Sequence, residues 1–149
     1  MTELQVHMDI ASPIERVFAA LSDHETFLNS LPGISTKVIR PGATERNGLG
    51  CLREVRSGEK VLYVEEITKW VRPTMYEYTI RETSIPLRHF GSDLQLKPTG
   101  TGTAVVWTSR FQITIPILRP ILAWHMKRRL SSAFRHYLAV AKQKLEGNV

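Results

Sequence analysis

Five histidines and one cysteine are the side chains of this sequence most able to hold a metal, and their spacing argues against a metal site. No HExxH motif or other paired-ligand spacing occurs among the histidines, which are His7, His24, His89, His125 and His136. His125 and His136 would share one side of a helix but lie roughly 16 Å apart along it. Cys51 stands alone, which excludes an intramolecular disulfide. We therefore expect no metal and no cofactor.

Hydroxyl and aromatic side chains alternate with other residues in several β-like segments. Alternate residues of a strand share one face, so each segment nominates a set that faces a long helix near the C-terminus. A buried hydroxyl without a partner costs about 1–3 kcal/mol, so we expect these hydroxyls to bind water or a ligand. The predicted lining is Tyr76, Tyr78, Phe90, Ser92, Leu94, Trp107, Ser109, Phe111, Met126, Leu130, Phe134 and Tyr137.

The elements that would position these residues follow from periodicity. Residues 2–10 alternate as a strand, Ser12 is placed to cap a helix that begins at Pro13, and Asp23 to cap a second one. Residues 34–115 contain six β-like runs separated by short turns, which predicts an antiparallel meander. A long amphipathic helix follows, from Pro120 to about Leu145. The chain is thus predicted to be a single α+β domain over residues 1–149.

Composition limits the classes of partner and location. The net charge is +6, which favours an anionic partner or simply a basic surface. The basic residues are dispersed and no aromatic-basic sheet motif occurs, so nucleic-acid binding is not expected. The sequence has neither a leader pattern nor a run of about 18 apolar residues, and with one cysteine this predicts a cytoplasmic protein.

Taken together, these segments resemble the START-like helix-grip superfamily (SRPBCC), and especially its polyketide cyclase/dehydrase and lipid-transport branch. The resemblance covers nearly the whole chain. It is carried by scaffold residues at 12–23, Asn47-Gly48-Leu49-Gly50, Glu65-Glu66-Ile67 before Arg72-Pro73, and Gly102–Trp107 leading to Phe111. It implies a helix-grip fold, in which a curved antiparallel sheet of about seven strands (β-α-α-β6-α) wraps around the C-terminal helix.

The resemblance also implies a function, namely binding of a small hydrophobic ligand such as a lipid, polyketide or quinone in an internal cavity. Such binding would serve transport or sequestration. Only some members of the superfamily are enzymes, so an alternative is a cyclase or dehydratase that uses the same cavity. The side chains that could then polarise a carbonyl or move a proton are Arg53, Glu54, Tyr76, Tyr78, His89 and Asp93. None stands out, so we name no catalytic residue and favour binding over catalysis.

A further alternative is a membrane- or ribosome-associated module resembling the coenzyme-Q-binding chaperones. Ile117, Ile121 and Trp124 fall off the predicted core stripe of the helix, close to Lys127 and Arg128. Such an apolar-basic patch would suit peripheral membrane contact, a protein partner or a homodimer. Burial of this segment in a bend before the helix is the competing interpretation.

Overall fold

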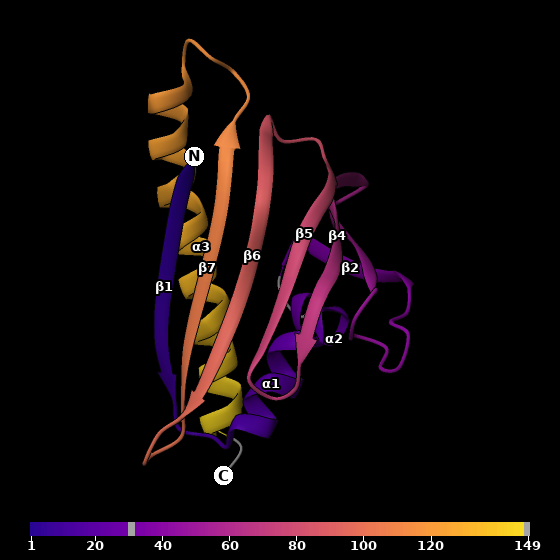
Figure 1. The fold of residues 1–149 in the computed structure, drawn as a ribbon, viewed down its shortest axis with the longest axis vertical. Coiled ribbons are helices and arrows are strands. Elements are labelled where there is room, and N and C mark those ends of the chain that lie inside the picture. Colours follow the sequence, from indigo (N-terminus) through magenta and orange to yellow (C-terminus); the bar gives the residue numbers. More distant parts are fainter. Residues whose placement is uncertain (30–31, 148–149) are drawn as a thin grey trace.

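A single antiparallel sheet with one long helix along its edge makes up most of the molecule (Figure 1). The computed structural model describes residues 1–29 and 32–147. The strands are β1 (Thr2–Ile10), β2 (Ile34–Arg40), β3 (Leu52–Ser57), β4 (Lys60–Val71), β5 (Met75–Thr83), β6 (Leu87–Pro98) and β7 (Thr103–Ile113). The helices are α1 (Ile14–Ser22), α2 (His24–Leu28) and α3 (Arg119–Gly147).

The strand order confirms the predicted meander. Strands β2 to β7 lie side by side in chain order, and β1 returns to the far edge beside β7, so that the sheet reads β1-β7-β6-β5-β4-β3-β2. All neighbours are antiparallel, and the β1–β7 register runs from Thr2 opposite Phe111 to Ile10 opposite Thr103. The α+β helix-grip prediction is therefore confirmed, with α3 packed on the sheet.

Helix α3 runs along the part of the sheet formed by β1 and β7, while α1 and α2 lie behind β4 and β5 (Figure 1). The Phe134 ring of α3 stacks on Trp107 of β7, with centroids 3.8 Å apart and planes 8° apart. Tyr137, one turn further along, meets the same indole edge to face at 5.3 Å. Three aromatic rings thus set the contact between the helix and the sheet.

The two short helices begin differently from one another. Asp23 caps α2 as predicted, since its Oδ1 accepts the N–H of Thr26 at 3.2 Å. The predicted cap on α1 is wrong: Pro13 is the N-cap residue, and the Ser12 hydroxyl is buried without a hydrogen-bond partner. The carbonyl of Pro13 instead starts the helix by accepting the N–H groups of Arg16 and Val17.

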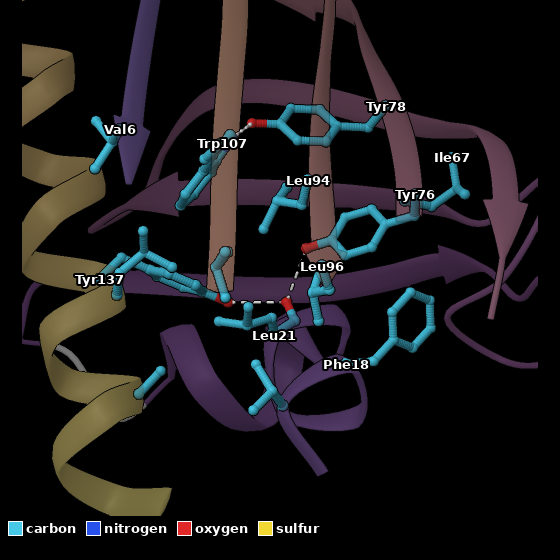
Figure 2. Close-up of a cluster of buried hydrophobic side chains, with 14 of the residues drawn as sticks. Val6, Phe18, Leu21, Ile67, Tyr76, Tyr78, Leu94, Leu96, Trp107 and Tyr137 are labelled. Carbon is cyan, nitrogen blue, oxygen red and sulfur yellow. Dashed lines mark hydrogen bonds between the residues drawn. The ribbon is translucent and has the colours of Figure 1, made fainter. Parts of the chain in front are cut away.

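The C-terminal end of α1 is anchored inside the protein (Figure 2). The last carbonyls of a helix lack partners within it. Here the hydroxyls of Tyr76 and Tyr137 both donate to the carbonyl of Leu21, at 3.0 and 3.1 Å. The Arg53 guanidinium donates to the carbonyl of Ser22 at 2.9 Å, and a cation is favourable at this negative end of the helix dipole. Strands β3 and β5 and helix α3 therefore all hold α1.

The charge of Arg53 is balanced within the same cluster. Arg53 is fully buried and its Nη2 lies 2.9 Å from Oε1 of Glu65, which is also buried. His24 Nδ1 lies 3.0 Å from the same oxygen, and it must be the donor because a carboxylate only accepts. Burial would raise the pKa of Glu65, but Arg53 and the hydrogen bond from His24 outweigh it and lower that pKa. Burial, and secondly Arg53, lower the pKa of His24, so the imidazole stays neutral.

We predict that Arg53→Met destabilises the fold by about 3–5 kcal/mol, because it leaves the Glu65 carboxylate buried without its cation. Chemical denaturation measures the change. The double variant Arg53→Met/Glu65→Met should recover part of the loss. Arg81→Met is the matched control: it removes a 2.7 Å ion pair with Glu66 on the exposed side of the sheet, and should cost at most about 1 kcal/mol. Equal losses in Arg53→Met and Arg81→Met would contradict the prediction.

Candidate functional site

A cavity of about 70 Å³ lies between strands β4–β7 and the N-terminal half of α3. The helix contributes Met126, Leu130 and Phe134, which are half-buried. The sheet contributes Tyr63, Tyr78, Ile80, Thr83, Leu87, His89, Ser92, Ser109 and Phe111, and the β5–β6 connection contributes Ile85. The volume is smaller than the roughly 300–1,000 Å³ typical of pockets that hold small molecules.

All the predicted lining residues except Phe90 divide into two groups. Those that line this cavity are Tyr78, Ser92, Ser109, Phe111, Met126, Leu130 and Phe134. Tyr76, Leu94, Trp107 and Tyr137 lie instead in the packed core near α1 (Figure 2). The Trp107–Phe134 stack lies at the border of the two regions, since Phe134 also faces the cavity.

Phe90 is the one predicted lining residue on the wrong face of the sheet. Its side chain is 42% exposed and packs against the Arg88 guanidinium, 5.3 Å from the ring centroid. The cause is a β-bulge: the β6–β7 register shifts between His89 and Ser92, and Gly91 has a φ of +113°. One inserted residue moves every earlier side chain to the other face. His89 therefore replaces Phe90 in the cavity, and the isolated glycine within a strand is the signal that could have indicated it.

A chain of hydrogen bonds forms the polar wall of the cavity. The N–H of Ile80 donates to His89 Nδ1 at 3.1 Å, so the ring proton is on Nε2. His89 Nε2 lies 2.8 Å from the Ser92 hydroxyl, which in turn donates to the Ser109 hydroxyl at 2.7 Å. The chain ends at Ser109, whose hydroxyl also lies 3.5 Å from His89 Nε2 and lines the cavity. The wall can donate a hydrogen bond to an oxygen atom held there.

The protonation states follow from burial. Burial lowers the pKa of His89 to about 4, because a desolvated imidazole disfavours its charged form. Burial also raises the pKa of Tyr78, whose hydroxyl accepts the indole N–H of Trp107 at 3.1 Å. At neutral pH the wall is therefore uncharged, with a neutral imidazole and neutral hydroxyls.

These contacts correct the expectation that the buried hydroxyls require water or ligand. Tyr76 and Tyr137 bind the Leu21 carbonyl, Tyr78 binds Trp107, and the two serines bind each other. The protein itself supplies a partner in every case. The feature that indicates a ligand is instead the group of half-buried apolar side chains beside a polar wall.

The six side chains considered for proton transfer do not converge. Arg53 and Tyr76 anchor α1, far from solvent. Glu54 pairs with Arg56. Asp93 lies outside the cavity. Its side chain is buried and pairs with Arg110 at 3.2 Å. Only Tyr78 and His89 face the cavity, and the geometry gives His89 the role of a donor through Nε2 rather than that of a base.

A second hollow of about 330 Å³ lies between α1, α2 and the C-terminal end of α3. It is lined by Ala19, Ala20, Asp23, Thr26, Ala141, Lys144 and Leu145. These are mostly small or charged side chains, and the hollow is outside the helix–sheet space. The smaller cavity has both the apolar side chains and the buried polar wall that ligand pockets combine, so we take it as the candidate site.

Comparison with known proteins identifies the fold and the family. Three solved structures superpose over nearly the whole of both chains. They are TTHA0849 from Thermus thermophilus (22% identity, TM-score 0.76, covering 99% of each chain), XoxI from Bacillus cereus (17%, 0.74, covering 97% of this chain and 96% of that one), and a START superfamily protein from Mycobacterium smegmatis (12%, 0.73, 99% of each). A search of curated proteins finds no match. Within the described residues, no helix is long and apolar enough to cross a bilayer. The family model described as polyketide cyclase / dehydrase and lipid transport matches residues 1–146, and the chain therefore belongs to this family.

Proposed function

We propose that this protein binds a small, largely apolar molecule between α3 and strands β5–β7, and that an oxygen atom of the ligand accepts the hydroxyl proton of Ser109. The observation that carries the proposal is the combination of half-buried Met126, Leu130 and Phe134 with the ordered His89–Ser92–Ser109 wall. The family's description, which includes lipid transport, supports the same class of ligand.

The small volume means that the site must widen when a ligand enters. Ligand pockets typically have about 300–1,000 Å³, several times the 70 Å³ present here. Met126 and Leu130 lie at the partly exposed side of the cavity, and methionine is unbranched and adapts readily to new packing. Rotation of these two side chains opens the site without moving the Trp107–Phe134 stack.

Binding is favoured over proton transfer because of the state of His89. Its Nδ1 lone pair is engaged by the Ile80 N–H, and its Nε2 carries the proton donated toward Ser92. A general base needs a free lone pair directed at the proton it removes. The wall is suited to holding an oxygen atom in place, as a carrier requires. A cyclase or dehydratase would need a further group in reach of the ligand.

We predict that Leu130→Trp, which fills the cavity, weakens the binding of a fluorescent naphthylamine probe by about tenfold or more. The affinity for decanol, measured by displacement of the probe, should fall by a similar factor. Ser109→Ala should weaken decanol binding by about threefold to tenfold, the worth of one hydrogen bond. Leu145→Trp, which fills the hollow beside α1, is the matched control and should bind as the unmodified protein does. Organic extraction and native mass spectrometry of the gently purified protein give a second readout. The proposal fails if neither probe binds, or if Leu145→Trp alone abolishes binding.

The neutral state of His89 predicts a pH dependence of stability. The folded-state pKa is about 4 and the unfolded-state value is about 6.5, so the unfolded chain takes up the proton first. The free energy of unfolding should therefore fall as the pH decreases from about 6.5 to 4, with up to about 3 kcal/mol due to His89. Denaturation at each pH should show a shallower dependence for His89→Gln and an unchanged one for the exposed control His136→Gln. An unchanged slope in His89→Gln would contradict the assignment.

A further inference from the structure

The N-terminal end of α3 carries apolar side chains that the rest of the fold leaves uncovered. Ile117 is 92% exposed, Leu118 48%, Ile121 69% and Trp124 61%. We call these four residues the apolar tip. They lie on the connection from β7 and the first turns of α3, at the end of the molecule away from α1 and α2 (Figure 1). The interpretation that this segment is buried in a bend is thereby overturned.

The apolar tip does not belong to the core side of the helix. At 100° per residue, Ile121 and Trp124 lie on the side of the helix away from Leu130, which lines the cavity. Arg128 continues the exposed face one turn later, and its guanidinium lies over the Trp124 ring at 5.0 Å from the centroid. Clustered exposed apolar residues rimmed by polar ones mark interaction surfaces.

The charged side chains that follow the apolar tip along α3 are all basic up to residue 145. Residues 119–145 contain seven Lys and Arg residues and no Asp or Glu, and the first turn of α3 has no acidic residue to offset the helix dipole. On the neighbouring strand β1, the carboxylate of Glu3 is already paired with Arg110 at 3.0 Å. The surface behind the apolar tip is therefore basic, with Arg128 and Arg135 roughly 6 and 16 Å along the helix from Trp124.

We infer that the apolar tip docks on an anionic lipid bilayer, with Trp124, Ile121 and Ile117 in the headgroup–acyl boundary. Tryptophan favours this boundary. Apolar residues buried about 5–10 Å deep, with cations facing anionic headgroups, form the recognised basis of peripheral binding. Arg128 and Arg135 then face the lipid phosphates. A second copy is a poorer occupant, because self-association through this face would bring Arg128 and its neighbours against their own like charges.

Vesicle flotation and tryptophan fluorescence of the full chain test the inference. We expect the protein to float with phosphatidylcholine vesicles that contain phosphatidylglycerol and to remain behind with phosphatidylcholine alone. The emission should shift to the blue on binding, and Trp124→Phe should remove the shift, because Trp70 and Trp107 are already covered to a larger extent. Ile121→Asp/Trp124→Asp and Arg128→Glu/Arg135→Glu should each lower the apparent affinity about tenfold or more.

Two control variants, placed elsewhere on the surface, change the total charge by the same amounts as the two variants of α3. Ile39→Asp/Phe90→Asp alters exposed apolar residues of the sheet, and Lys37→Glu/Lys97→Glu alters exposed lysines. Both should bind vesicles as the unmodified protein does. The inference is overturned if the unmodified protein does not float, or if the controls lose as much binding as the variants of the apolar tip. It is also overturned if sedimentation shows a stable dimer that Ile121→Asp/Trp124→Asp dissociates.

Discussion

The stack of Phe134 on Trp107 determines how α3 lies on the sheet, and the other features of the helix–sheet space depend on it. With the ring centroids 3.8 Å apart, the helix is held along β1 and β7 and cannot settle deeper over β5 and β4. On the side of α1, the space is closed by packed side chains that include Tyr76, Leu94 and Tyr137. Toward the N-terminal end of α3, the side chains of Met126 and Leu130 meet the sheet less completely, and a cavity remains.

Two buried polar systems use similar residue types for different purposes. Near α1, Arg53, Tyr76 and Tyr137 are directed at carbonyl oxygens of the helix end and at Glu65, so their polar atoms hold the fold together. Near the N-terminal half of α3, His89, Ser92 and Ser109 form a neutral chain in one direction that ends at the cavity. Removing Arg53 from the first system leaves the buried Glu65 carboxylate without its cation, whereas the second system keeps a donor for an incoming oxygen atom. Fold alone does not assign a function, and it is this second system that distinguishes a binding site from ordinary core.

The fold could be predicted from the sequence, but the site only in part. Regular alternation and turn residues identify the strands, and the apolar stripe of residues 126–141 identifies α3, because both signals are local and periodic. The lining of β6 was predicted wrongly before Ser92, since the bulge at Gly91 interrupts the alternation and exchanges Phe90 for His89. The hydroxyl partners could not be predicted, because Tyr76 and Tyr137 are separated by 55 and 116 residues from the Leu21 carbonyl. The volume of the cavity depends on how two aromatic rings meet in space, which no sequence pattern encodes.

The central claim, that a ligand occupies the space between α3 and strands β5–β7, is tested most directly by mapping where decanol binds. In heteronuclear NMR spectra of the isotope-labelled protein, we predict that decanol shifts the signals of His89, Ser109, Met126 and Leu130, while those of Ala20, Ala141 and Leu145 stay in place. Shifts confined to these last three residues would assign binding to the hollow beside α1. Either that result or spectra unchanged at saturating decanol would contradict the account.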